Sequence, residues 1–179
     1  GFKISSVPFH MWAPDVYEGA PTSITAFIAT GSKAAVFAAL IRFVVAGLRT
    51  FQADTAALLW GLAVVSMTVG NVVAIAQKDI KRLLAYSGIA QMGNLLIGLA
   101  AGTKMGGDAV LFYLVTYLVA NLGAFAVVII FSNLTGSDQI EDYSGLSRRS
   151  PLLAAAMMVF LLSLAGVPQL AGFIGKIYV

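Results

Sequence analysis

Three lysines lie in or beside stretches of sequence that are otherwise apolar: Lys3, Lys33 and Lys176. A lysine at the centre of a membrane helix costs about 2.5 to 3.5 kcal/mol on the insertion scale, which argues that such a residue has a function. Surroundings of low dielectric constant favour an amine over an ammonium ion, so a buried lysine can gain and lose a proton. The three side chains are therefore candidates for a proton relay. The alternative for each is a long side chain that reaches the lipid headgroups.

Two prolines interrupt apolar runs near these lysines: Pro8 comes five residues after Lys3, and Pro168 comes eight residues before Lys176. Proline lacks the backbone N–H and crowds the carbonyl four residues earlier, so we expect the helix to break at each position. Non-helical backbone at membrane depth occurs where it is buried in protein or lines a wet cavity. Two broken helices with a charged residue beside each break are typical of transporters built from two repeats. Simple proline kinks are the alternative.

Neutral polar residues occur at helical spacing in two of the apolar runs. Tyr86 and Gln91 lie in one run, and Tyr117 and Asn121 lie in the next. Such side chains could hold a chain of water molecules or hydrogen-bond one helix to another. We regard these four residues as candidates for a water path.

His10 is the one histidine of the chain, and it follows Pro8 by two residues in a region predicted to turn toward the membrane interface. It is a candidate for the point where protons enter, and the alternative is an interfacial histidine beside Trp12. All eight Asp and Glu residues lie between the apolar runs. Because an unpaired buried charge is costly, we expect a partner carboxylate upstream of Gly1.

The composition excludes a soluble globular protein. Of 179 residues, 59% are hydrophobic and 11% are charged, which leaves too few charges to cover a globular surface. The net charge of +3 comes without a basic run interleaved with aromatic residues, so nucleic-acid binding is not indicated. The absence of cysteine excludes disulfides, thiolate metal sites, iron–sulfur ligation and cysteine nucleophiles, and a single histidine argues against a histidine-built metal site.

The elements that must position these residues are membrane helices, because backbone groups inside lipid have no water to bond. The sequence predicts an all-α polytopic bundle of about six passages, two of them broken. Four charge-free runs cover residues 56–77, 83–101, 109–132 and 152–175, a fifth run with Lys33 and Arg42 covers 24–48, and residues 1–12 form the end of a sixth helix.

The basic residues predict the orientation. Loops 13–22, 78–82 and 133–151 carry five Lys and Arg residues, against three on the other side, which predicts that these loops are cytoplasmic. The chain starts without Met or a signal peptide and ends within an apolar run, so we interpret it as an internal piece of a longer membrane protein.

Several motifs resemble the antiporter-like, proton-conducting membrane subunits of bacterial respiratory complex I. They are HMWAPDVYEGAPT at residues 10–22, QKDIKRLLAYS at 77–87, LAGVP at 164–168 and GFIGK at 172–176. The resemblance covers essentially the whole chain. The KRLLAY stretch alone is shared by the wider family, which includes cation/proton antiporters and membrane-bound hydrogenases.

This resemblance implies a fold of two inverted five-helix repeats. Residues 1–49 would end the first repeat, and residues 56–179 would form most of the second, with its last helix broken near Pro168. Lys3, Lys33 and Lys176 would be the relay lysines. The protein would lie in the bacterial inner membrane, with other membrane subunits and the lipid bilayer as partners. It would form part of a NADH:quinone oxidoreductase and bind no cofactor itself, with NADH, FMN, iron–sulfur clusters and quinone in partner subunits.

Two alternatives stay open: an antiporter or hydrogenase subunit of the same superfamily, and a structural membrane scaffold whose lysines only anchor neighbouring subunits. The chain also departs from the family pattern. Gln91 and Asn94 stand where relatives often have histidine and tyrosine, and residues 109–132 contain no Lys or His. The link between Lys33 and Lys176 must then consist of water or neutral side chains.

Overall fold

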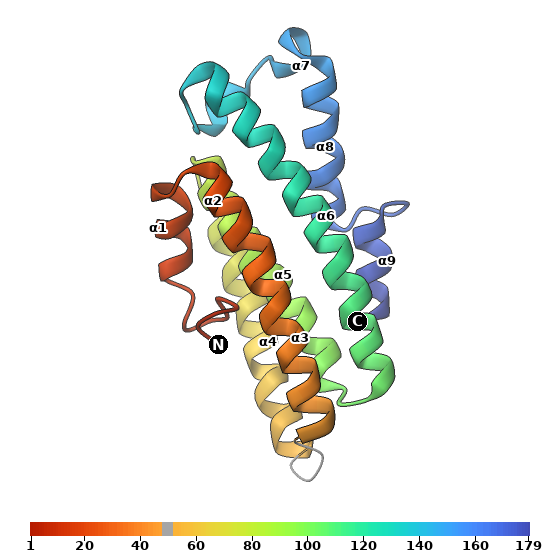
Figure 1. Cartoon of the computed structure of the whole chain (residues 1–179). Helices are drawn as coiled ribbons and strands as arrows, with labels where there is room; N and C mark the ends of the chain where they lie inside the picture. The colour runs from red at the N-terminus through yellow and green to blue at the C-terminus, as the bar shows by residue number, and fades with distance from the viewer. Residues whose placement is uncertain (48–51) are drawn as a thin grey trace.

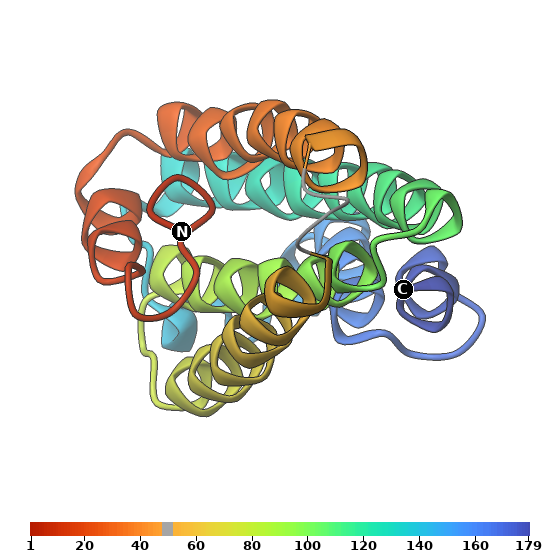
Figure 2. The same ribbon diagram turned by 90° about the horizontal axis from the view of Figure 1, so that it is seen from below.

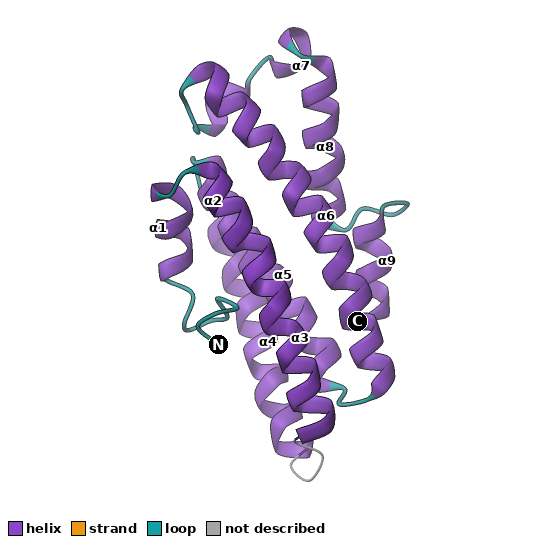
Figure 3. Ribbon diagram, in the orientation of Figure 1, coloured by secondary structure: helices purple, strands orange, loops and turns teal. Residues whose placement is uncertain are grey.

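The computed structural model describes residues 1–47 and 52–179, and in those residues the regular elements are all helices (Figures 1 and 3). In chain order they are α1 (Trp12–Gly19), α2 (Thr22–Phe27), the π-helical η1 (Ile28–Ser32), α3 (Lys33–Arg42), the π-helical η2 (Phe43–Gly47), α4 (Gln52–Ile75), α5 (Ile80–Ala100), α6 (Lys104–Thr135), the 3-10 helix η4 (Ile140–Tyr143), α7 (Leu146–Arg149), α8 (Pro151–Ala165) and α9 (Ala171–Tyr178). The prediction of an all-helical protein is confirmed.

Within the described residues, four helices are long and apolar enough to cross a membrane: Thr22–Arg42, Ala53–Ile75, Ile80–Ala100 and Lys104–Thr135. The first of these is the continuous helix formed by α2, η1 and α3. α8 is also apolar but has only 15 residues. The count of six passages therefore stays a prediction.

Side chains and backbone conformation define where the two central helices begin and end. Asp79 caps α5, because its Oδ1 atom accepts hydrogen bonds from the Lys81 and Arg82 backbone N–H groups at 2.8 and 3.0 Å. Thr103 caps α6 by accepting from the Gly106 N–H at 3.0 Å. Gly136, with a φ of 71°, ends α6. α6 thus begins five residues earlier than the charge-free run predicted, because its first turn can expose charged residues.

α5 is the most buried long helix and packs along α4 (Figure 2). The two backbones come close at Gly70, where an added methyl group would lie 2.7 Å from the Ala90 backbone nitrogen. Small residues at such crossings let membrane helices pack by van der Waals contact. α5 also contacts α1, which precedes it in the sequence, and α6, which follows it.

The chain is not helical between α8 and α9, from Gly166 to Leu170, and both helices pack against α6 (Figure 1). Pro168 lies in this segment. Gly166 has a φ of 83° and its N–H bonds the carbonyls of Leu162 and Ser163, which ends α8. The run predicted over 152–175 is therefore two short helices with an interruption.

Residues 1–11 form turns, so the helix end predicted over residues 1–12 is wrong for this segment. Pro8 supplies no N–H, Ser5 has a φ of 57°, and the Val7 N–H bonds the Ser66 hydroxyl at 3.0 Å instead of a helical carbonyl. The repeat boundary predicted at residue 49 lies outside the described residues, as does Arg49.

Candidate functional site

Lys33 is the most deeply buried lysine and is 1% exposed at the first position of α3. The turn before it, η1, is π-helical, a geometry that is frequent at functional sites. Among the residues that the structure describes, no group accepts a hydrogen bond from the Lys33 Nζ atom. Such a position suits a lysine that exchanges a proton rather than one fixed in an ion pair.

Three other helices supply the surroundings of Lys33. The Tyr17 ring of α1 has its centroid 5.8 Å from Nζ. On α5, a methyl group added to Gly88 would lie 2.9 Å from Nζ and 3.3 Å from the Tyr117 hydroxyl, so glycine leaves room for the lysine head. Tyr117 of α6 donates a hydrogen bond to the Ala29 carbonyl at 3.2 Å. The pocket around Lys33 is therefore aromatic, with no carboxylate among these contacts.

Asn121 lies one turn beyond Tyr117 on α6 and is 1% exposed. Its Nδ2 atom has no hydrogen-bond acceptor within the described part of the chain. Tyr117 and Asn121 are thus two neighbouring polar groups on the buried face of α6.

Lys176 contacts the end of α8 from the last turn of a different helix, α9. Its Nζ atom donates hydrogen bonds to the Leu164 and Ala165 carbonyls, both at 3.0 Å, and the side chain is half-buried. These carbonyls have no helical partner because α8 ends at Ala165. The C-terminal end of a helix carries partial negative charge, so the interrupted helix provides a cation site without a carboxylate.

Gln91 of α5 reaches the same carbonyl as Lys176. Its Nε2 atom donates to the Leu164 carbonyl at 2.7 Å, and its Oε1 atom accepts from Asn94 Nδ2 at 3.1 Å and from the Tyr113 hydroxyl. The amide therefore connects the Lys176 site on one side with two polar groups of α5 and α6 on the other.

A small cavity of about 10 Å³ lies between the two lysine sites, a volume suited to roughly one water molecule. Its walls contain Tyr117 from the Lys33 site and Tyr113 and Leu164 from the Lys176 site. The complete lining is Tyr113, Thr116, Tyr117, Ala120, Ser163, Leu164 and Gly172. The cavity is thus bordered by residues of both lysine sites, among them two tyrosine side chains.

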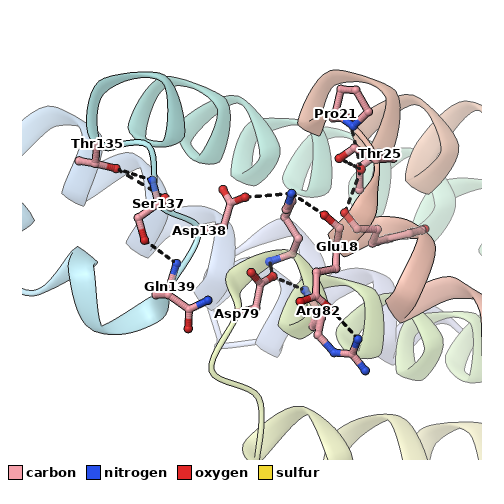
Figure 4. A network of polar contacts seen from close by, with 12 residues as sticks. Glu18, Pro21, Thr25, Asp79, Arg82, Thr135, Ser137, Asp138 and Gln139 are labelled. Atoms are coloured by element: carbon pink, nitrogen blue, oxygen red, sulfur yellow. Dashed lines mark hydrogen bonds and ion pairs between the residues drawn. The ribbon is translucent and has the colours of Figure 1, made fainter.

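A network of charged groups lies at the end of the bundle where α5 begins (Figure 4). Arg82 Nη1 binds Asp15 Oδ1 at 2.8 Å and Glu18 Oε2 at 2.6 Å. Lys81 Nζ binds Asp138 Oδ2 at 2.9 Å and donates to the Glu18 carbonyl at 2.8 Å. The network therefore joins segments 13–22, 78–82 and 133–151, which the charge count placed on one side.

The sequence matches over residues 1–179 the protein family described as NADH:quinone oxidoreductase/Mrp antiporter, TM. The chain belongs to this family. The resemblance inferred from the motifs is confirmed.

Relatives and solved structures of this family match nearly the whole chain. NADH-quinone oxidoreductase subunit N of Desulforamulus reducens is 56% identical over 178 residues, which are 99% of this chain and 37% of the relative. A chain of respiratory complex I from Thermus thermophilus is 44% identical with a TM-score of 0.80, over 99% of this chain and 38% of that one. A chain of the Mrp complex from Dietzia sp. has a TM-score of 0.90 at 24% identity, over 99% and 33%, and shares the fold. This chain spans between 33% and 38% of the length of these proteins.

The structure brings together some of the residues singled out from the sequence. Lys33 is adjacent to Tyr117, and Lys176 shares an acceptor with Gln91. Tyr86 is elsewhere: its ring belongs to a separate apolar cluster with Val7 and Ile89.

Three of the predicted residues, Lys3, Pro8 and His10, lie in the non-helical segment before α1. Lys3 is exposed, so the expectation of a buried ammonium group at this position is not met in the described residues. His10 is 8% exposed, and its Nδ1 atom has no partner among those residues. Pro8 lies in the turns that precede α1.

Sequence reasoning missed Tyr17, Gly88 and Tyr113. Tyr113 precedes Tyr117 by four residues in the same apolar run, so the helical spacing that indicated Tyr117 and Asn121 could also have found it. No local signal indicates Tyr17, because it belongs to α1, a short helix outside the apolar runs.

Proposed function

We propose that this chain is part of a proton-translocating membrane subunit of NADH-quinone oxidoreductase, in which redox reactions in partner subunits drive protons through buried lysines. The observation that carries the proposal is Lys33, a buried lysine with no carboxylate or carbonyl partner in the described residues. The coupling to redox reactions is proposed from the names of the relatives, among them NADH-quinone oxidoreductase subunit N.

The route proposed here runs from Lys33 to Lys176 through neutral groups. A proton leaving Lys33 passes the Tyr117 hydroxyl and the small cavity to reach Tyr113, because hydroxyl groups and water both donate and accept hydrogen bonds. Gln91 holds the Tyr113 hydroxyl in place and bonds the Leu164 carbonyl, which Lys176 also binds. The structure thus offers candidates for the link that lacks lysine and histidine.

The remaining parts of the proposal concern the longer protein. Lys3 would be completed by a carboxylate upstream of Gly1, with His10 near the point where protons enter. Residues 1–49 and 56–179 would belong to two inverted repeats, the second with its last helix broken at Pro168. Loops 13–22, 78–82 and 133–151 would face the cytoplasm of a bacterial cell. NADH, FMN, iron–sulfur clusters and quinone would be bound by partner subunits.

The test is the number of protons pumped per NADH oxidised by the intact complex, reconstituted in vesicles and carrying Lys33→Ala. We expect this ratio to fall, because the relay loses its buried amine. Lys78→Ala is the matched control, since Lys78 is exposed at the end of the bundle. An unchanged ratio in Lys33→Ala contradicts the relay and favours a structural scaffold.

The ion that moves is tested by the same vesicles. A proton relay through amines and hydroxyls needs no sodium, so pumping should be equal in sodium and potassium media. Strict dependence on sodium would instead support a cation/proton antiporter function.

A further inference from the structure

α1 brings one buried side chain to the Lys33 pocket from the edge of the bundle. Asp15, Val16 and Glu18 are exposed, whereas Tyr17 between them is 1% exposed. Burial raises the pKa of the Tyr17 hydroxyl, so the ring stays neutral near pH 7. α1 therefore contributes an uncharged aromatic ring to the lysine pocket.

The Tyr17 ring is placed between Lys33 and α6. Its centroid lies 5.8 Å from the Lys33 Nζ atom, within the range of a cation–π interaction. On α6, Phe125 packs edge-on against it at 6.3 Å between centroids. The Tyr17 hydroxyl has no hydrogen-bond partner in the described part of the chain. The ring face, rather than the hydroxyl, is therefore the part of Tyr17 that bears on the lysine.

Polar contacts hold α1 on both sides of Tyr17. Arg82 binds the carboxylates of Asp15 and Glu18, two residues before and one residue after Tyr17. The Thr25 hydroxyl donates to the Tyr17 carbonyl at 3.1 Å. The Asp15 and Glu18 side chains are 74% and 48% exposed, and ion pairs of this kind are individually weak. The loss of these ion pairs alone should therefore cost little stability.

We infer that α1 is a cap over the Lys33 pocket: Tyr17 is a positioning residue that covers the Lys33 side chain, and Arg82 holds Tyr17 in place. The ring face stabilises the ammonium form electrostatically, and the ring excludes water from the end of the pocket where the charged network lies. The effect of the cap on pumping rests on the proposed function, but its closure over Lys33 does not.

Closure can be measured by thiol labelling, because this chain has no cysteine. Ala29 is fully buried, lies one turn before Lys33 and has its carbonyl bonded by Tyr117, so Ala29→Cys places a thiol beside the Lys33 pocket. The detergent-solubilised complex is treated with a water-soluble maleimide, and modification of this subunit is followed by peptide mass spectrometry. We expect slow labelling in Ala29→Cys alone and about tenfold faster labelling when Arg82→Gln is added.

Arg148→Gln is the matched control for labelling, since Arg148 is an exposed arginine of α7 near the same end of the bundle. It should leave the labelling rate unchanged. Equal rates in Ala29→Cys with and without Arg82→Gln would overturn the cap, whatever the result of Lys33→Ala. A failure of the cap is therefore distinguishable from a failure of the relay.

Pumping by the intact complex tests the role of the ring. Tyr17→Leu removes the ring face, and we expect the ratio of protons to NADH to fall by at least half while NADH oxidation continues. Tyr17→Phe keeps the ring, and we expect it to retain most of the parent's ratio of protons to NADH. Equal losses in the two variants, or no loss in Tyr17→Leu, would overturn the role of the ring face; if Tyr17→Leu fails to assemble, the labelling result decides.

Discussion

Gly88→Ala is a minimal change that acts directly on the Lys33 pocket. The added methyl group would lie 2.9 Å from the Lys33 Nζ atom, so the lysine head must move by about 0.5 Å to reach an ordinary contact of 3.4 Å. The Tyr117 hydroxyl, 3.3 Å from the same methyl group, must give by a smaller amount. The lysine side chain is long enough to make this adjustment, so the helix should still form.

The expected result is normal assembly with slower pumping. Alanine is favoured over glycine in a helix by about 0.8 to 1 kcal/mol, which offsets part of the strain. A displacement of about 1 Å at a reacting group can slow a reaction by about 100-fold, so a shift half as large is expected to reduce proton transfer by roughly tenfold. The assay is the initial rate of proton uptake into vesicles at a fixed rate of NADH oxidation.

Gly61→Ala is the matched control. Gly61 also lies within a long helix, α4, but no atom lies within 4 Å of the position of an added methyl group. It gains the same helix propensity without touching the pocket, so pumping should equal that of the parent. Parent-like pumping in Gly88→Ala would refute the reasoning, because it would mean that the position of the Lys33 amine does not limit proton transfer.

Two further changes test the surroundings of the site. Gln91→Leu removes the hydrogen bond from Gln91 to the Leu164 carbonyl and leaves the Tyr113 hydroxyl without its acceptor. Thermal unfolding of the purified complex should therefore show this subunit destabilised by about 1 to 3 kcal/mol. Tyr143 stacks on Phe131 at 3.8 Å between centroids, and its hydroxyl has no partner among the described residues. Tyr143→Phe should therefore leave the unfolding temperature unchanged or slightly raised, whereas Tyr143→Ala should destabilise by about 2 kcal/mol.

The parts of the structure that follow from local composition could be predicted from the sequence. The charge-free run at 83–101 corresponds to α5, because a long apolar run has no other way to satisfy its backbone in lipid. Lys33 could be singled out because one charge in an apolar run stands out. Lys3 could not be placed correctly, since turns around Pro8 and the bond from Val7 to Ser66 depend on tertiary contacts.

The contacts that define the site depend on pairs of residues far apart in the chain. Tyr17 reaches Lys33 from α1, which Arg82, 64 residues after Glu18, binds. Gln91 meets the Leu164 carbonyl only because α8 ends at that point, 73 residues later. Contacts between residues so far apart in the sequence do not affect the local spacing of residue types, so periodicity alone cannot predict these contacts.

α5 connects these contacts physically. It carries Arg82, which holds the α1 cap, Gly88, which faces Lys33, and Gln91, which binds the end of α8. At a rise of 1.5 Å per residue, Arg82 and Gln91 are about 13.5 Å apart along one rigid helix. A change at the Lys176 site that moves the Leu164 carbonyl would therefore displace α5 through Gln91. Because α5 also carries Gly88 and Arg82, this displacement would reach the Lys33 pocket and the α1 cap. Faster labelling of Ala29→Cys in the presence of Gln91→Leu would support this coupling, and an unchanged rate would confine the effect of Gln91 to its own end of the path.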